Sequence, residues 1–568
     1  MTYSIMINSK VNGMNSEQLF NKDIAAALES VDIPSWSDAQ LRVFREARFG
    51  SGNLVVNAVA GSGKTTTLEG LAFAVPHGKT KRFLAFNKAI AAELQNRVPE
   101  LNASTIHSYA FGIFSKAIGY PKANSSKIFF IATSHVAVNY PYLEWDEASD
   151  LVQDIIDPFN MARMTRTDLY DDKEMSRMCF ERGVVGYSKP RVDDYRVIEE
   201  VACWTARKER DYRSLSPKAA AVVNHLQTSG YKGSSRIPKQ PWIDFNEMIM
   251  IPLDNGLIIP ENDYVLWDEA QDSNQLFYEF IKATVVDGGR IIAVGDYRQN
   301  IMGFAGSFVD GMQSLIAQMN ATVLPLDISY RLPVKHALLS QEIFPGTEPA
   351  PWAIEGEIFE CNYSALRQAI QEADDPSDFM VICRTNAPAI AFAMSLIAAR
   401  IPAYVKGRDF GDQLVKIISK IGLFRKKPRQ GLVFKENFLE FVMDWRSKEQ
   451  QKLIAKEAGD RAFDILDDKA ASIIALWEGT EADNIYGFIE DVNALFSEGS
   501  GVTLSSIHRS KGLEARFVGV LDYDKFWANH RSVVTDSQVF GENCVRYVAL
   551  TRAKEVLYLA TSDDRYGE

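Results

Sequence analysis

The sequence predicts an α/β protein with two units, each built around a sheet of parallel strands. Short apolar runs alternate along the chain with longer helical patterns, which is typical of parallel sheets covered by helices. The runs form one group before residue 330 and a second group after it, so we expect two sheets. The first run leads into the glycine-rich turn Gly61-Ser62-Gly63, as in a strand–turn–helix unit. The predicted strands are Leu54–Val56, Phe83–Phe86, Tyr264–Trp267, Ile291–Val294, Met380–Cys383, Phe517–Leu521 and Val556–Ala560.

Two stretches depart from this alternation and predict helical insertions. Both carry charged and aromatic helical patterns with few strand-like runs. Each lies inside one of the two groups of strands, so each α/β domain is expected to be discontinuous in sequence. The expected domains are 1–111 with 241–330, interrupted by the insertion 112–240, and 331–412 with 501–568, interrupted by the insertion 413–500.

Length and composition bound the class of protein. With 568 residues, of which 46% are apolar and 24% charged, the chain is long enough for several globular domains. The five cysteines include no CxxC pair, which argues against a disulfide framework and against a zinc site. No apolar run approaches the roughly 18 residues that span a bilayer, and the N-terminal residues lack a signal-peptide pattern. We therefore expect a cytoplasmic protein with no membrane partner.

The segment from Ala58 to Thr65 reads Ala-Val-Ala-Gly-Ser-Gly-Lys-Thr and follows an apolar strand. Backbone N–H groups of such a turn wrap a phosphate chain, Lys64 reaches the outer phosphates, and the Thr65 hydroxyl holds Mg²⁺. Ala58 stands where the strict pattern has glycine, and the alternative is a turn that only reverses the chain. The expected nucleotide contacts are Ala60, Gly61, Ser62, Gly63, Lys64, Thr65 and Thr66.

Two further strands end in polar residues that suit phosphate hydrolysis. The strand at Val265 runs into Asp268 and Glu269; the first would hold Mg²⁺ and the second would polarise the attacking water. The strand ending at Val294 is followed by Gln299, which would hydrogen-bond the γ-phosphate or the water. The alternatives are solvated acids at a strand end and a surface turn.

In this order, the three segments resemble motifs I, II and III of superfamily 1 helicases of the UvrD/Rep/PcrA type. Further segments match the remaining motifs in family order, from residue 37 to residue 553. The resemblance therefore covers nearly the whole chain. The other matching segments are Ser37–Gln40 (Q motif), Phe86–Ala89 (Ia), Thr105–Ser108 (Ib), Asp244-Phe245, Ile328–Arg331 (IV), Gly407–Phe410, Ser506–Glu514 (V) and Tyr547–Ala553 (VI).

The resemblance implies two RecA-like domains, with ATP and Mg²⁺ bound in the cleft between them. It assigns Gln40 to the adenine edge, Tyr330 to stacking on the adenine and Glu514 to the ribose hydroxyls. It also assigns Arg331 and Arg552 as arginine fingers, which neutralise charge on the γ-phosphate during transfer. Taken separately, each arginine is an ordinary surface salt-bridge residue.

The resemblance also implies a track for a nucleic-acid strand, although the net charge of −12 alone disfavours a polyanionic partner. A motor of this kind needs phosphate contacts and flat faces for bases. The chain departs from the family at Met302, where a second aromatic is usual, and at Ala305, where a basic residue is usual. The expected contacts are Asn87, Thr105, His107, Phe304 and His508.

We therefore expect an ATP-dependent DNA helicase or translocase that moves 3′ to 5′ on single-stranded DNA and acts at junctions of single and double strands. The polarity comes from the resemblance alone. The second insertion is shorter than in large family members, so protein partners for loading or processivity are expected. A motor that remodels protein–DNA complexes with little strand separation, and a 5′–3′ or RNA motor, remain alternatives. The expected location is the bacterial or viral-host cytoplasm, with the nucleoid; the pathway is left open.

Overall fold

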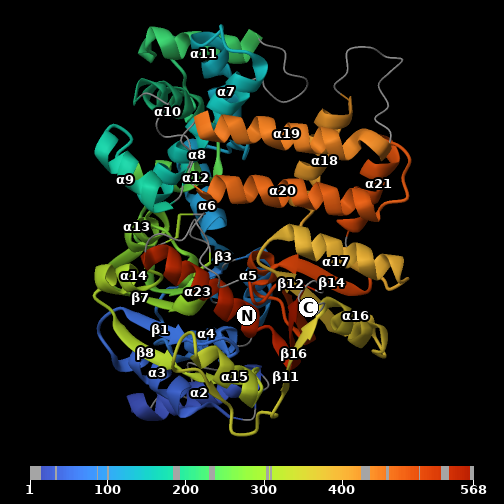
Figure 1. The fold of residues 1–568 in the computed structure, drawn as a ribbon. Coiled ribbons are helices and arrows are strands. Elements are labelled where there is room, and N and C mark those ends of the chain that lie inside the picture. The colour runs from blue at the N-terminus through green and yellow to red at the C-terminus, as the bar shows by residue number, and fades with distance from the viewer. Residues whose placement is uncertain are drawn as a thin grey trace. The chain divides into compact units, whose positions relative to one another are not determined.

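The chain divides into two compact units, Met1–Asp327 and Ile328–Glu568 (Figure 1). The fold was described from a computed structural model. The described residues are 15–31, 33, 35–85, 87–98, 101–182, 184, 192–228, 237–301, 306–307, 310–423, 435–455, 460–497, 499–525 and 536–562.

The first unit is built on a six-stranded sheet with the order β3-β2-β6-β7-β1-β8, and all its paired strands are parallel. Its central strands are short buried apolar runs, as expected when helices cover both faces of a parallel sheet. The prediction of a parallel α/β unit is confirmed. The strands are β1 Leu54–Ala58, β2 Lys81–Ala85, β3 Ala103–Thr105, β6 Asn262–Trp267, β7 Val285–Gly295 and β8 Thr322–Leu326.

Side chains of successive strand residues enter two different cores, because they point to opposite faces of the sheet. Leu54 and Val56 join the core under one set of helices, whereas Val55 between them joins the core on the other face. The first face is covered by α2 Ser16–Val31, α3 Asp38–Phe49, α4 Lys64–Ala74 and α5 Lys88–Arg97. The second is covered by α6 Ile106–Ile118, α12 Phe245–Asp254, α13 Gln275–Ala283 and α14 Gln313–Met319.

A helical part with its own core is inserted between α6 and α12. The small parallel pair of β4 Lys122–Ala123 and β5 Trp242–Ile243 joins the segments where the chain leaves and re-enters the α/β part. The core contains Ile131, Phe159 and Ile198, and the helices lie together in Figure 1. The helices are α7 Lys127–Asn139, α8 Trp145–Thr165, α9 Asp172–Arg182, α10 Val192–Ala206 and α11 Pro217–Thr228. The exact bounds of the domain stay a prediction.

Four buried charges join this helical part to α12. Arg163 of α8 donates to both oxygens of Asp244, at 2.7 and 2.9 Å, and Lys127 of α7 donates to both oxygens of Glu247, at 2.7 Å each. Burial alone would raise the pKa of Asp244, but the adjacent guanidinium outweighs it and leaves that pKa below its usual range. Asp244 and Glu247 also cap the start of α12 reciprocally. The network therefore sets where α12 begins.

The second unit contains another six-stranded parallel sheet, with the order β11-β16-β15-β12-β14-β13. All three strands predicted after residue 330 are present in it. A separate two-stranded pair of β9 Ile328–Ser329 and β10 Glu348–Pro349 lies at the start of the unit. The sheet strands are β11 Glu357–Asn362, β12 Phe379–Cys383, β13 Ala403–Val405, β14 Val502–Ser506, β15 Ala515–Leu521 and β16 Ala553–Thr561.

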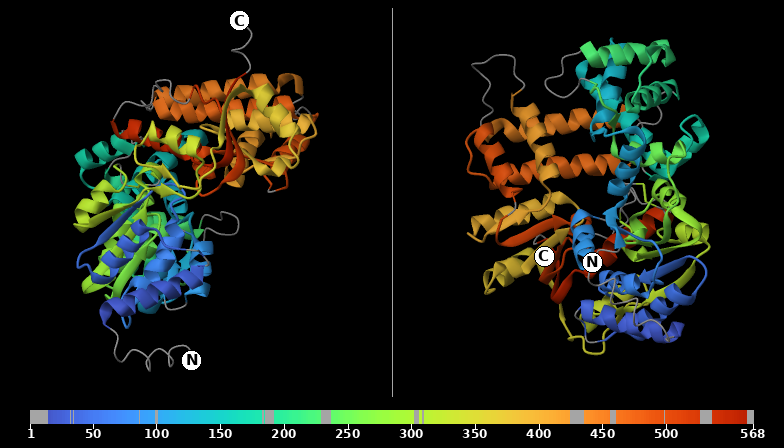
Figure 2. Two further views of the ribbon diagram at one scale, coloured as in Figure 1. Left: turned by 90° about the horizontal axis from the view of Figure 1, so that it is seen from below. Right: turned by 180° about the vertical axis from the view of Figure 1, so that it is seen from behind.

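The helices between residues 363 and 495 share one core with the sheet of the second unit. These helices, coloured yellow to orange, lie together with that sheet in Figure 2. The rings of Phe438, Trp477 and Phe488 meet at centroid distances of 4.3 to 5.5 Å, in the same cluster as Val381 and Leu504 of the strands. The expected insertion 413–500 is therefore helical but has no separate core among the described residues. The helices are α15 Val334–Gln341, α16 Tyr363–Gln371, α17 Asn386–Ala398, α18 Arg408–Leu423, α19 Lys435–Ala455, α20 Asp460–Gly479, α21 Ile485–Leu495, α22 Ile507–Ser510 and α23 Asp536–Leu550.

Within the described part of the chain, no helix has both the length and the apolar character needed to cross a lipid bilayer.

Arg163→Ala should destabilise the first unit by about 3–5 kcal/mol, because it leaves the buried Asp244 carboxylate without its partner. Arg166→Ala is the matched control: its ion pairs with Asp254 and Glu279 are partly exposed and should be worth about 1 kcal/mol or less. Denaturant unfolding followed by far-UV circular dichroism measures both. Equal losses in the two variants would contradict the assigned role of the buried pair.

Candidate functional site

The turn after β1 forms an open helix N-terminus. Gly61 and Gly63 have φ angles of +75° and +79°, a left-handed conformation that glycine adopts without a steric penalty. The Ser62 hydroxyl donates to the Val59 carbonyl at 2.8 Å, which closes the turn. Gly63 precedes α4, and no side chain caps the first turn of that helix. The N–H groups there, with Lys64 on the same turn, suit an anionic group such as a phosphate.

Gln40 connects the start of α3 to this turn. Its side-chain oxygen accepts from the backbone N–H of Ser37 at 3.0 Å, and its amide nitrogen donates to the Thr67 hydroxyl at 3.1 Å. Thr67 in turn donates to the Gly63 carbonyl at 2.9 Å. The structure thus places Gln40 beside the glycine-rich turn 61–63, which is called the phosphate turn below. Both the oxygen and the nitrogen of the Gln40 side-chain amide are hydrogen-bonded to the protein. An adenine contact, which stays a prediction, would require the amide to exchange these bonds.

Two adjacent carboxylates follow β6. Asp268 is 4% exposed, and burial, together with the charge of Glu269, raises its pKa to about 7 even though Lys64 acts in the opposite direction. Glu269 has a φ of +49°, which is unusual for a residue with a side chain. A cation bound beside Asp268 would favour its ionised form.

The residues present suit Mg²⁺. The candidate protein ligands are the Asp268 carboxylate and the Thr65 hydroxyl, both hard oxygen donors. Mg²⁺ usually takes one or two such ligands and completes its shell with water and substrate phosphates. A coordinating role for either residue stays a prediction.

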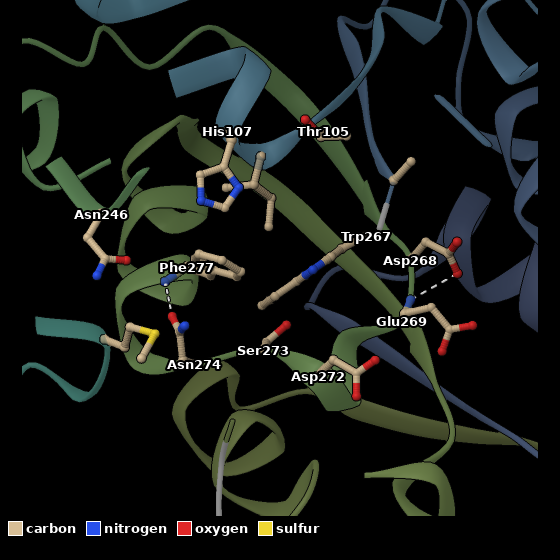
Figure 3. A pocket seen from close by; sticks show the side chains of 13 residues that line it. Thr105, His107, Asn246, Trp267, Asp268, Glu269, Asp272, Ser273, Asn274 and Phe277 are labelled. Carbon is tan, nitrogen blue, oxygen red and sulfur yellow. Dashed lines mark hydrogen bonds between the residues drawn. The ribbon is translucent and has the colours of Figure 1, made fainter. Parts of the chain in front are cut away.

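A pocket of about 300 Å³ extends from these carboxylates along the end of the sheet (Figure 3). In Figure 3, Asp268, Glu269 and Asp272 lie on one side of it, and His107 lies on the other. The His107 ring meets Phe245 and Phe277 edge to face, with centroids 5.4 and 5.5 Å away. Burial lowers the pKa of His107, so the neutral imidazole is favoured. The pocket residues are Ala85, Thr105, Ile106, His107, Met164, Asn246, Trp267, Asp268, Glu269, Asp272, Ser273, Asn274 and Phe277.

Gln299 lies at the end of the neighbouring strand β7. It is buried, and its amide nitrogen donates to a carboxylate oxygen of Asp296 at 2.8 Å. Since β6, β7 and β1 are adjacent and parallel, their carboxyl ends meet at one edge of the sheet. Lys64, Asp268, Glu269 and Gln299 therefore gather there, as the sequence predicts, although none of the individual roles is tested.

Of the residues in the first unit that are predicted to contact nucleic acid, Asn87, Thr105 and His107 are described. Asn87 and Thr105 cap α5 and α6, accepting from the backbone N–H groups of Ile90 at 2.9 Å and Ser108 at 3.2 Å. Both side chains thus have a local structural role at the start of a helix. Four residues of the prediction lie outside the described residues: Phe86, Met302, Phe304 and Ala305.

In the second unit, Glu514 bridges two cations. Its carboxylate accepts from Arg331 at 2.6 Å and also pairs with Lys554. Burial alone would raise the pKa of Glu514, but Lys554 and Arg331 outweigh it and leave that pKa below its usual range. The predicted ribose and γ-phosphate residues are thus neighbours, and His508 lies on the short helix α22 of the same unit.

Tyr330 stacks on an aromatic residue that the sequence analysis did not single out. Its ring lies 6.0 Å from that of Trp352, with an angle of 23° between the planes. Tyr330 is 40% exposed and Trp352 is 74% exposed. The pair offers a flat surface, which suits stacking of a base.

Arg552 is 1% exposed and its guanidinium is directed into the second unit. It donates to the carbonyls of Val548 at 2.9 Å and Leu513 at 3.3 Å, and to the Thr551 hydroxyl at 2.9 Å. In this arrangement it joins the end of α23 to the loop that carries Glu514. Its predicted contact with a γ-phosphate stays a prediction.

Family comparisons agree with this arrangement. The sequence model of the UvrD/REP helicase N-terminal domain matches residues 37–320, which is half of the chain. The chain belongs to the UvrD/Rep helicase family. The model of the UvrD-like helicase C-terminal domain matches residues 480–564 of this family member. The first match contains the phosphate turn and the two carboxylates, and the second contains Glu514 and Arg552.

Curated relatives of this UvrD/Rep family member are distant and longer. DNA helicase II of Haemophilus influenzae is 22% identical over 403 residues, covering 64% of this chain and 51% of that protein. ATP-dependent DNA helicase PcrA of Staphylococcus epidermidis is 21% identical over 452 residues, covering 59% of this chain and 61% of that protein. A probable DNA helicase II homolog of Mycoplasma pneumoniae is 24% identical over 285 residues, covering 47% and 36%. The chain thus spans about a third to three fifths of the length of these relatives.

Sequence reasoning missed two residues at this family member's candidate sites. Lys554 follows Arg552 by two positions and shares Glu514 with Arg331, but an isolated lysine beside a strand carries no pattern. Trp352 lies 22 positions after Tyr330 and reaches it only through the fold. A tryptophan in the proline-containing segment 349–354 is the one signal that could have drawn attention to it.

On the prediction that the turn after β1 holds the phosphates of ATP, Lys64→Ala should lower kcat/KM for ATP hydrolysis roughly 100-fold or more, because it removes the cation of that turn. Melting temperature should stay near that of the wild type. Lys22→Ala, on the exposed side of α2, is the control. Undiminished turnover in Lys64→Ala would remove the assignment of the phosphate turn.

Proposed function

We propose that this protein is an ATP-dependent DNA helicase or translocase that moves 3′ to 5′ along single-stranded DNA. The observation that carries the proposal is the edge of the first sheet, where the turn with Lys64, the carboxylates Asp268 and Glu269, and Gln299 come together in a member of the UvrD/Rep helicase family. The printed names of the relatives, DNA helicase II and ATP-dependent DNA helicase PcrA, support DNA and ATP as the substrates.

The proposed chemistry is transfer of the γ-phosphoryl group of ATP to water. The N–H groups at the start of α4 and the Lys64 ammonium would hold the phosphates. Bound Mg²⁺, held by Thr65 and Asp268, would neutralise charge on the phosphates. Glu269 would orient the attacking water and accept its proton, and Gln299 would contact the γ-phosphate or that water.

Residues of the second unit enter the proposal through the family resemblance. Arg331 and Arg552 would neutralise charge that develops on the γ-phosphate, and Tyr330 would stack on the adenine. Glu514, with Arg331 and Lys554 around it, would meet the ribose hydroxyls. Arg331 Nε lies 2.6 Å from a carboxylate oxygen of Glu514, which supports the assignment of these two residues to one site.

DNA contact is proposed at the pocket and at the helix starts of the first unit, through Asn87, Thr105 and His107, and at Phe304 and His508. Single strands and junctions of single and double strands are the proposed substrates. A cytoplasmic, nucleoid-associated location and protein partners for loading belong to the same proposal.

ATP hydrolysis measured with and without single-stranded DNA and RNA tests the proposal. Single-stranded DNA should raise the rate roughly tenfold or more, a coupling of the usual size between two sites. Lys64→Ala should remain inactive in every condition. A rate that does not respond to any nucleic acid would overturn the proposed motor, and stimulation by RNA alone would replace DNA with RNA as the track.

Unwinding of duplexes that carry a 3′ or a 5′ single-stranded tail tests polarity and strand separation. Only the 3′-tailed duplex should open. Opening of the 5′-tailed duplex would reverse the proposed direction. DNA-stimulated hydrolysis without opening of either duplex would instead support a translocase that remodels protein–DNA complexes.

A further inference from the structure

The side chain of Gln271 lies fully buried between the two carboxylates after β6 and the turn after β7. It belongs to the short helix η3 Ala270–Asp272, directly after Glu269. Its amide nitrogen donates to Oε2 of Glu269, and its oxygen accepts from the backbone N–H of Asp296 at 2.9 Å. The orientation of the amide is determined, because an N–H donor can pair only with the amide oxygen.

The backbone of Glu269 adopts a conformation that needs support. Its φ of +49° lies in the left-handed region, which disfavours residues with a Cβ. Such conformations persist where the surrounding structure holds them, and they concentrate at functional sites. The bond from Gln271 holds one oxygen of the carboxylate and therefore sets the direction in which Oε1 points.

Gly295 makes the approach of Gln271 possible. A Cβ at this position would lie 2.5 Å from the Gln271 side-chain oxygen and 3.1 Å from its backbone nitrogen; it would also lie 2.9 Å from Sδ of Met312, a flexible side chain. Because both distances to Gln271 are shorter than ordinary contacts, even alanine would push the amide away from Asp296. The position of Gln271 therefore depends both on the segment after β6 that carries it and on the glycine at the end of β7.

The hydrogen bonds continue beyond Gln271 to Gln299. Asp296 is fully buried; its N–H donates to Gln271, and its carboxylate accepts from Gln299 at 2.8 Å. The chain of contacts is therefore Glu269, Gln271, Asp296 and Gln299. One end is the proposed water-orienting carboxylate, and the other is the proposed contact of the γ-phosphate.

We propose that Gln271 is a positioning residue that directs the Glu269 carboxylate toward the attacking water and links its direction to the turn that carries Gln299. The inference rests on the proposed function, in which Glu269 orients that water. When Gln299 exchanges Asp296 for the γ-phosphate, the Asp296 turn changes its contacts, and Gln271 carries that change to Glu269. Gln271 is fully buried and acts through Glu269.

Gln271→Glu removes the bond that Gln271 donates to Glu269. The variant keeps the size of the side chain and an oxygen for the Asp296 N–H, but it loses the donor and places a negative charge beside Glu269. We expect kcat for ATP hydrolysis to fall roughly 10- to 100-fold, as for loss of a supporting hydrogen bond around a reactive group. Binding of a non-hydrolysable ATP analogue should change by no more than about twofold.

Gln275→Glu is the matched control. Gln275 also donates to a glutamate, Glu279 at 2.9 Å, and also accepts from a nitrogen, Nε2 of Gln318 at 3.0 Å. It lies on α13, outside the proposed chain of contacts. Its kcat should match that of the wild type within about twofold.

Gly295→Ala gives a second, independent test. It should lower kcat as Gln271→Glu does, and the double variant should lose little more than either single variant, because both remove the direction that Gln271 gives to the Glu269 carboxylate. Additive losses, or a wild-type kcat in Gln271→Glu, would overturn the positioning role. A wild-type protein that hydrolyses no ATP would overturn the proposed function itself, which separates the two failures.

Discussion

The candidate site depends on the order of the strands in the first sheet. In a parallel sheet every strand ends at the same edge, so the residues after one strand can meet only the residues after its neighbours. Strands β6, β7 and β1 are adjacent, and their ends carry Asp268 with Glu269, Asp296 with Gln299, and the turn before Lys64. Residues more than 200 positions apart thereby share one edge. The same order allows Gln271 to contact the end of β7.

This edge of the sheet carries charges of both signs, which suits a ligand that contains both an anionic and a cationic group. The N-terminus of α4 and Lys64 bring positive potential, whereas Asp268 and Glu269 place two carboxylates side by side, one of them buried. Burial and the neighbouring charge raise the pKa of Asp268 to about 7. The carboxylates would hold a magnesium ion and the start of α4 would hold the phosphates of a nucleoside triphosphate, so that one ligand would offset both groups of charges.

The two helical stretches, which look alike in sequence, differ in how they are stabilised. The first has a core of its own and meets α12 through buried charges, with Arg163 and Asp244 at their centre. The second shares its core with the sheet of its unit, through Phe438 and Trp477. Helical periodicity shows that one face of each helix is buried, but it does not show what covers that face. Whether an insertion has an independent core is therefore a tertiary property.

The sequence by itself determined the two parallel α/β units, the positions of the predicted strands and the glycine-rich turn after the first strand. Buried strands and glycine-dependent turns require particular residues within a few positions of one another. It also brought out Asp268 and Glu269, since their position at the end of an apolar strand is a local pattern. The tertiary structure decided the partners of those residues. Gln271 contacts Asp296, Trp352 stacks on Tyr330, and Lys554 shares Glu514 with Arg331. These contacts join separate segments of the chain, and only the packing of the elements brings such segments within hydrogen-bonding or stacking distance.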